Sequence, residues 1–292
     1  MSKTLYGILC GVGAAAIWGG MYVVSKVVLK VIPPFSLVTI RLVLGGLSLW
    51  LIRIICGGVK IERKQFFQVI GVGLIGYGIS LGFQFVGTNL STASNGSLVT
   101  SATPAFILLF AWIILRERIT PLRLSALLIS TLGVVAVIDP RSAQLNPGLF
   151  LGNLSLLAAA LTWALYSVLI RIVTRKLDVL TVTLIAFLGG LPIVFPAGLW
   201  ELSNSGIGHI DFGIFAGILF LGFISTALAM VLWNTAFAVL DASVASLTFF
   251  AQPVVGSLLG WILLKETITP LFLLGALLIA IGLIIASRDT GS

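Results

Sequence analysis

Residues 93–121 read ASNGSLVTSATPAFILLFAWIILRERITP, and residues 242–270 read ASVASLTFFAQPVVGSLLGWILLKETITP. The two stretches are identical at 14 of 29 positions. Each is apolar for about 20 residues, the length that an α-helix needs to cross the hydrocarbon core of a bilayer. Each ends in a basic residue and a glutamate before Ile-Thr-Pro, and a Thr-Pro pair is typical of the start of a further helix. The stretch therefore predicts a membrane hairpin that occurs twice.

The composition of the whole chain is that of a membrane protein. Hydrophobic residues make up 59% and charged residues 9% of its 292 residues, values far from those of soluble domains. A lipid-spanning backbone must satisfy its own hydrogen bonds, and long apolar runs without alternation favour helices over a closed barrel. We therefore expect an all-α integral membrane protein whose partner is the lipid bilayer. The net charge of +8 lies mostly in short connections, where it sets topology, so we expect no nucleic-acid partner.

Apolar runs separated by glycine, proline and charged residues predict ten transmembrane helices. With ten spans both termini lie on one side of the membrane. If that side is the cytoplasm, twelve basic residues lie inside and only Lys30, Arg141 and Lys265 lie outside, as the positive-inside rule requires. We expect a multi-pass protein of the cell membrane with both termini cytoplasmic. The expected spans are about 5–29, 34–55, 66–86, 92–115, 121–138, 148–172, 178–200, 212–235, 241–264 and 270–287.

A weaker second sign of duplication relates the starts of the two halves of the chain. The residues 14–16 and Tyr22 match 158–160 and Tyr166. Each half then holds five spans, and because five is odd, the second half enters the membrane inverted relative to the first. We predict a first five-helix repeat over 1–138, an external linker over 139–147 and a second five-helix repeat over 148–292. Two inverted repeats are the architecture of many alternating-access transporters.

The repeated pattern of Ala-Ser, a mid-helix proline and Leu-basic-Glu-x-Ile-Thr-Pro resembles the EamA-type transporters of the drug/metabolite transporter superfamily. The resemblance covers nearly the whole chain. It implies a transporter of small molecules, and members of that superfamily export amino acids, metabolites or drugs, or exchange sugar phosphates and nucleotide sugars. The resemblance therefore implies a reaction type and leaves the solute open.

Enzymatic activity is not expected. The chain has one histidine and nine scattered carboxylates, which do not form the cluster of acid, base and nucleophile that a catalytic site needs. It also lacks a nucleotide-binding motif. We therefore expect no catalytic residue, no metal and no cofactor.

Two bases fall inside expected spans, and ionisable residues in the membrane are costly and usually functional. Arg41 lies in the second span without a deep acidic residue to neutralise it. One hypothesis is that its guanidinium binds a carboxylate or phosphate of the solute through two parallel hydrogen bonds. The alternative is that it binds backbone carbonyls at a helix break or extends outward. Lys26, near the outer end of the first span, is expected to reach the interface.

Aromatic side chains form a second candidate group. Trp18 and Tyr22 are four residues apart and share a helix face, and Trp163 and Tyr166 form a similar face on the sixth span. The two tryptophans lie near mid-span, which favours a cavity over an interfacial belt, although a belt stays open. The predicted substrate-binding residues are Trp18, Tyr22, Arg41, Tyr77, Asn95, Trp163, Tyr166 and Gln252.

Pro104 and Pro253 interrupt the fourth and ninth spans, which frees backbone carbonyls and permits bending. We predict them as hinges, with a static packed bend as the alternative. Glu117 and Glu266 each follow a base at the end of a span. A structural salt bridge and helix cap is the predicted role of both, with a proton carrier as the alternative.

These observations favour a secondary transporter that exports small amino-acid-like, carboxylate or zwitterionic solutes by alternating access. The alternative is an exporter of several drugs or other cationic compounds, which a deep acidic residue would favour and Arg41 disfavours. A homodimer is left open.

Overall fold

The fold is known from a computed structural model, which describes residues 2–57, 61–91, 96, 99–138, 147–264 and 270–288. This part of the chain is helical and contains no strand. Predicted positions Asn95 and Glu266 lie outside the described residues. The elements are α1 (Lys3–Val28), α2 (Pro34–Ile55), α3 (Arg63–Gly73), η1 (Leu74–Ser80), α4 (Leu81–Leu90), α6 (Thr103–Phe110), η2 (Ala111–Leu115), α7 (Pro121–Ile138), η4 (Pro147–Leu149), α8 (Phe150–Thr174), α9 (Val179–Ser205), α10 (Phe212–Leu219), η5 (Phe220–Leu228), α11 (Ala229–Val239), α12 (Ala242–Leu247), η6 (Thr248–Phe250), α13 (Ala251–Leu264) and α14 (Pro270–Arg288).

Six helices among the described residues are long and apolar enough to cross a bilayer. The longest of them extend about 42 Å at 1.5 Å per residue, which exceeds the hydrocarbon core. Shorter apolar helices accompany them, so the expectation of an all-α membrane protein is confirmed. The count of ten spans and the inverted relation of the two halves stay predictions. The six long helices are Lys3–Val28, Pro34–Ile55, Arg63–Leu90, Phe150–Thr174, Val179–Ser205 and Phe212–Val239.

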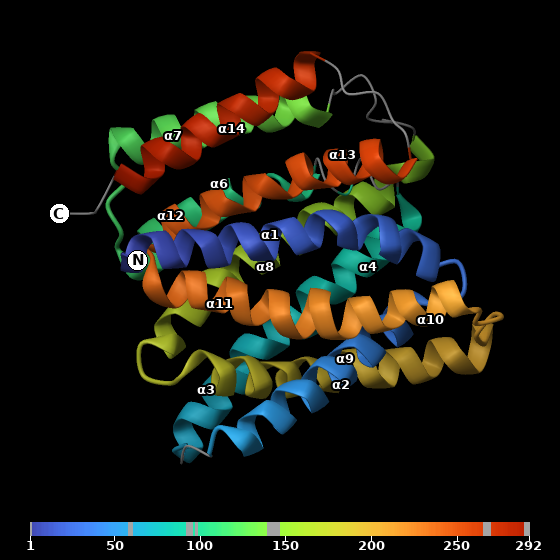
Figure 1. The fold of residues 1–292 in the computed structure, drawn as a ribbon. Coiled ribbons are helices and arrows are strands. Elements are labelled where there is room, and N and C mark those ends of the chain that lie inside the picture. The colour runs from blue at the N-terminus through green and yellow to red at the C-terminus, as the bar shows by residue number, and fades with distance from the viewer. Residues whose placement is uncertain are drawn as a thin grey trace.

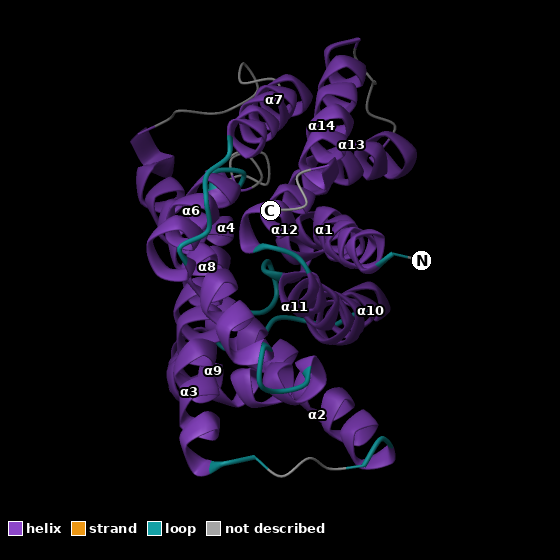
Figure 2. Cartoon of the chain, turned by 90° about the vertical axis from the view of Figure 1, so that its left-hand side faces the viewer, coloured by secondary structure: helices purple, strands orange, loops and turns teal. Residues whose placement is uncertain are grey.

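Helices from the two sides of the expected linker are interleaved (Figures 1 and 2). From the first side, α1 packs against α11 and α13 of the second. From the second side, α8 packs against η1, α4 and α6 of the first. The pair α7 and α14 forms one edge of the molecule, at the top of Figure 2. The core therefore lies between the two halves of the sequence and not within either of them.

Glycines allow α3 and α9 to pack with their backbones in contact. A Cβ atom added at Gly73 would collide with the carbonyl oxygen of Ala186, and one added at Gly189 would collide with that of Ile70. Small residues serve this purpose in membrane proteins because lipid offers no hydrophobic force between helices, so association depends on close van der Waals contact. The two glycines bring α3 and α9 together, and α9 also packs on α2.

Several helices change geometry in their middle. The continuous helix Arg63–Leu90 contains the π-helical segment η1, and Phe212–Val239 contains η5. A new helical segment, α6, begins at Thr103 with Pro104 in its first turn. The 3-10 turn η6 precedes α13, which has Pro253 in its first turn. Such π segments occur frequently at functional sites, and these four irregular regions all contribute to the site described next.

Candidate functional site

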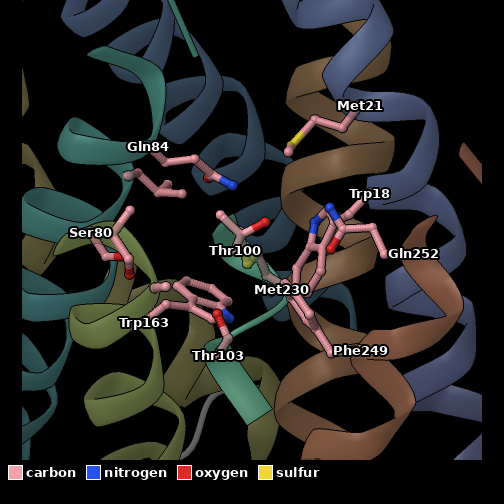
Figure 3. A pocket seen from close by; sticks show the side chains of 13 residues that line it. Trp18, Met21, Ser80, Gln84, Thr100, Thr103, Trp163, Met230, Phe249 and Gln252 are labelled. Carbon is pink, nitrogen blue, oxygen red and sulfur yellow. The ribbon is translucent and has the colours of Figure 1, made fainter. Parts of the chain in front are cut away.

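A cavity lies beside these irregular segments, between side chains of several helices (Figure 3). Its volume is about 30 Å³. In Figure 3, Gln84 and Trp163 lie on one side, and Trp18, Met21 and Gln252 lie on the other. Both sides of the expected linker contribute, because α1, α4 and α6 precede it and α8, α11 and α13 follow it. The lining residues are Trp18, Met21, Ser80, Leu81, Gln84, Thr100, Thr103, Ala159, Ala160, Trp163, Met230, Phe249 and Gln252.

Aromatic rings form much of the cavity wall. The ring centroids of Trp18 and Trp163 are 5.6 Å apart with an edge-to-face orientation, and those of Trp18 and Phe249 are 6.2 Å apart. These are favourable geometries for aromatic pairs. None of the described lining side chains carries a charge. An apolar aromatic box with a few polar atoms is typical of a small-molecule site.

Three polar atoms in the wall have no hydrogen-bond partner among the described residues. They are Nε1 of Trp163, Oγ1 of Thr103 and Oε1 of Gln252. A buried polar atom without a partner costs about 1–3 kcal/mol, so most such atoms are satisfied by protein or water. Three of them around one cavity indicate positions that a bound molecule can satisfy.

The cavity is small. About 30 Å³ is room for one or two water molecules, whereas sites for organic ligands measure about 300–1,000 Å³. The cavity is therefore too small for a solute of the expected size, which fits only after the surrounding helices move apart.

Tyr22 lies behind the wall and positions two lining residues. Its hydroxyl is 3.1 Å from Oγ1 of Thr100 and accepts a hydrogen bond from Nε2 of Gln84 at 3.0 Å. Thr100 and Gln84 belong to different helical segments, so Tyr22 links them through α1. This places Tyr22 next to the cavity but not among its lining residues.

Tyr77 and Tyr166 form a buried polar network behind Trp163. Their hydroxyls bind each other, and the Tyr166 hydroxyl donates to Oδ1 of Asn234 at 2.8 Å. Asn234 Nδ2 donates in turn to Thr183 at 2.9 Å. The ring of Trp163 lies 4.8 Å from that of Tyr166 and 6.2 Å from that of Tyr77. The two tyrosines therefore support the position of Trp163.

Arg41 is completely buried. Its Nε donates to Oγ1 of Thr226 at 2.9 Å, and its Nη2 donates to Oγ of Ser225 at 3.2 Å. Both hydroxyls belong to η5. The guanidinium carbon lies 4.7 Å from the ring centre of Phe85, a distance typical of a cation–π contact. The π-helical segment thus supplies the polar groups that hold the arginine in the core.

The positive charge of Arg41 is not neutralised by any described acidic residue. Its Nη1 also has no hydrogen-bond partner among the described residues. The Nη2 atom lies 3.6 Å from Sδ of Met21, which lines the cavity. Arg41 therefore lies one side chain behind the wall. A lone buried cation is strongly disfavoured, which makes this position a candidate for anion binding.

The predicted substrate-binding residues thus fall into two groups. Trp18, Trp163 and Gln252 line the cavity, and Tyr22, Arg41, Tyr77 and Tyr166 lie directly behind it. The second group is held away from the cavity by hydrogen bonds that the sequence does not reveal. Sequence reasoning missed the supporting residue Asn234, and it missed Met21, Met230 and Phe249, whose residue types equally suit ordinary packing.

The helical membrane architecture and this central cavity define a class of protein, the multi-pass membrane transporters. Within that class, the EamA-like transporter family matches the chain twice, over residues 5–138 and 150–288. The chain therefore belongs to the EamA-like transporter family, as the repeated pattern implied.

Relatives that match over nearly their full length are also named as transporters. An uncharacterised transporter of Archaeoglobus fulgidus is 29% identical over 93% of this chain and 95% of its own. The uncharacterised transporter YoaV of Bacillus subtilis is 25% identical over 97% of this chain and 96% of its own. A solved structure titled only as the crystal structure of a protein superposes with a TM-score of 0.80 at 20% identity, over 96% of this chain and 98% of that one. It supports the fold.

Proposed function

We propose that this protein is a secondary transporter that exports small amino-acid-like, carboxylate or zwitterionic solutes across the cell membrane. The observation that carries this proposal is Arg41, a buried cation without an acidic partner among the described residues, one side chain behind an otherwise uncharged cavity. A solute carboxylate supplies the missing negative charge. The unpartnered atoms Gln252 Oε1 and Thr103 Oγ1 then accept hydrogen bonds from the ammonium group of a zwitterion.

The proposed mechanism is alternating access by two inverted five-helix repeats, 1–138 and 148–292, joined by the external linker 139–147. The two family matches support it, because each covers one of these segments. The packing supports it too, since α1 contacts α11 and α13 in the way that α8 contacts α4 and α6. In such transporters the solute binds between the repeats, where both halves can move around it.

The proposed orientation has both termini in the cytoplasm. Many basic residues lie at the end of the bundle where α1 begins, including Arg53 at the end of α2 and Arg123 at the start of α7. The positive-inside rule associates such an excess with the cytoplasmic side. Export then corresponds to loading of the cavity from this end.

An apolar organic cation is the second candidate solute. The rings of Trp18, Trp163 and Phe249 suit cation–π binding, and no charged side chain lines the described cavity. The position of Arg41 disfavours this solute, because like charges repel in a medium of low dielectric constant.

Thermal stabilisation of the purified protein separates the two solutes, because a ligand that binds only the folded state raises Tm. We would screen amino acids, organic acids, phosphates and cationic drugs against the wild type and Arg41→Met. The substitution removes the charge and keeps an apolar side chain of similar length, which is often tolerated. We expect carboxylates to raise the Tm of the wild type and to lose this effect in the variant.

Two outcomes would contradict the proposal. Equal stabilisation of the wild type and Arg41→Met by carboxylates would show that Arg41 does not bind them. Stabilisation by cations alone would favour the cationic solute. Flux of the stabilising solute in vesicles of known orientation then tests export.

A further inference from the structure

Four charged side chains form a cluster at the end of the bundle where α1 begins. Arg123 lies 2.6 Å from Asp241 and 3.5 Å from Glu117. Arg171 lies 2.7 Å from Asp241 and 3.5 Å from Glu117. The two arginines and two carboxylates alternate and neutralise one another. Glu117 and Arg123 precede the expected linker, and Arg171 and Asp241 follow it. Two of the four contacts, Arg123 with Asp241 and Arg171 with Glu117, therefore join the two halves.

Glu117 also caps a helix of the opposite half. Its carboxylate accepts hydrogen bonds from the backbone N–H of Ala242 at 2.8 Å and of Ser243 at 3.1 Å, and from the Ser243 hydroxyl at 2.6 Å. These amides begin α12, where a negative charge is favoured by the helix dipole. Glu117 forms its ion pairs with Arg123 and Arg171. Its neighbour in sequence, Arg116, is not a partner, although adjacency suggested it. The contacts of Glu117 are instead long-range.

The cluster is connected to the cavity through two broken helices. The helix formed by α6 and η2 carries Thr103 in the cavity wall and leads directly to Glu117. The helix formed by α12, η6 and α13 starts beside Asp241 and carries Phe249 and Gln252 in the wall. Both helices are therefore held at their cluster ends by the same four charges, and neither can move away from the other while the cluster is intact.

The opposite end of the bundle has a related contact without described carboxylates. There Nζ of Lys26 donates to the carbonyl oxygens of Thr88, Asn89 and Ser91 at 2.8, 3.3 and 2.7 Å. At the cluster end, Arg171 donates to the carbonyl of Phe237 at 3.0 Å. Phe237 follows Thr88 by the same 149 positions that separate the repeated stretches. The two ends thus share a base that binds the end of a helix, and among the described residues carboxylates pair with that base at the cluster end. At the Lys26 end, Glu201 instead caps α2 by accepting hydrogen bonds from the N–H and the hydroxyl of Ser36 at 2.9 and 3.2 Å.

We propose that the Glu117–Arg123–Arg171–Asp241 cluster is a latch that keeps the cavity closed at this end, and that transport requires the latch to separate. The proposal rests on the alternating-access function proposed above. Separation leaves partly buried charges without partners, which is costly, so the closed state is favoured until a solute compensates. The cost is met only if solute binds the open state more tightly than the closed one.

Accessibility of a cysteine in the cavity tests the latch without any solute. The two native cysteines, Cys10 and Cys56, are free and would be replaced by alanine, and Thr103→Cys would serve as the reporter. The reagent is a membrane-impermeant methanethiosulfonate, applied separately to each side of the membrane in oriented vesicles. The reaction rate then reports how often the cavity opens to that side.

The test variant is Asp241→Asn, which keeps a good N-cap residue and removes the charge that both arginines bind. We expect reporter labelling from the cluster side to become at least about tenfold faster, which corresponds to about 1.4 kcal/mol, while labelling from the other side does not increase. The matched control is Asp178→Asn. Like Asp241, Asp178 stands at an N-cap position and lies close to an arginine, at 3.7 Å. Its side chain accepts a hydrogen bond from the N–H of Thr181, and neither Asp178 nor that arginine, Arg53, lines the cavity. The control should leave the rate unchanged.

A double-mutant cycle keeps the test valid if a variant loosens the whole protein. Contacting residues give non-additive effects, whereas independent sites add. In combination with Arg171→Met, Asp241→Asn should therefore accelerate labelling by less than the product of the two single effects. Unchanged labelling in Asp241→Asn, or equal acceleration by the control, would overturn the latch. Failure of the proposed function would instead appear as absent ligand stabilisation and flux, with the labelling result unaffected.

Discussion

At the scale of single residues, Met21 determines how Arg41 meets the cavity. The sulfur atom of Met21 contacts the guanidinium, and the same side chain forms part of the cavity wall. Methionine is unbranched and adaptable, so it can rotate away from Arg41 at low cost. If the solute is a carboxylate, as proposed above, rotation of Met21 would expose the guanidinium to it.

Shortening the Met21 side chain should therefore strengthen anion binding. In Met21→Ala the guanidinium faces the cavity directly, and we expect the carboxylate concentration that gives half-maximal thermal stabilisation to fall about tenfold, equivalent to about 1.4 kcal/mol. Met230→Ala is the matched control, since Met230 lines the same cavity and has no hydrogen bond to Arg41. An equal change in both variants would mean that added volume, and not Arg41, causes the effect.

The buried network behind Trp163 permits a second prediction at this scale. Asn234→Leu removes the groups that bind Tyr166 and Thr183 and leaves buried hydroxyls with fewer partners. The expected loss of stability is about 1–3 kcal/mol, measured as a lower Tm. Thr235→Val is the control, because Thr235 is adjacent in sequence and its hydroxyl binds only the carbonyl of Val231 within its own helix. Similar losses in both variants would argue against a special role of the network.

At the scale of helices, backbone contact between α3 and α9 leaves no space for a side chain at Gly73. Gly73→Ala places a methyl group against the carbonyl of Ala186, so the helices must separate and the Tm should fall. In the same helix, a Cβ at Gly71 meets nothing within 4 Å. Gly71→Ala should raise stability slightly, because alanine favours helix by about 1 kcal/mol over glycine. Stability losses of equal size would show that the two helices do not pack in this way.

Helix bounds were largely predictable from the sequence, and the interior of helices was not. The run 34–55 is helical as α2, and 121–138 as α7, because proline and apolar length mark helix ends and membrane spans by local chemistry. The π segment η5 has no such mark, since its extra residue is stabilised by tertiary contacts, including Trp18 Nε1 donating to the carbonyl of Ser225 at 3.0 Å. Tertiary contacts depend on residues far apart in the chain.

The same distinction between local signals and long-range contacts explains which features of the site could be predicted. Trp163 could be predicted as a wall residue because a mid-span tryptophan suits a cavity better than an interface. Arg41 could be predicted as functionally important from its position in an apolar span, but its place behind Met21 depends on hydroxyls of η5, 184 and 185 positions away. Long-range partners of this kind are not encoded in spacing along one helix.

At the scale of the whole molecule, the proposed latch predicts that solute cannot cross while the cluster end is held closed. A bifunctional thiol reagent that bridges Glu117→Cys and Ser243→Cys, in a background without Cys10 and Cys56, should hold the cluster end closed. These positions are in contact across the two halves, with Ser243 Oγ 2.6 Å from Glu117 Oε2. We expect solute flux in proteoliposomes to be lost on bridging and restored on reduction.

A control bridge distinguishes a gate from general stiffness of the bundle. Arg53→Cys and Asp178→Cys would join α2 to the start of α9, which also connects the two sides of the linker, at a contact of 3.7 Å outside the cluster. This bridge should leave flux intact, because α2 and α9 remain packed on each other in any motion that separates α6 from α12. Flux that survives the bridge between 117 and 243 would be inconsistent with alternating access through this end, since the helices that carry Thr103 and Gln252 in the wall would still be joined there.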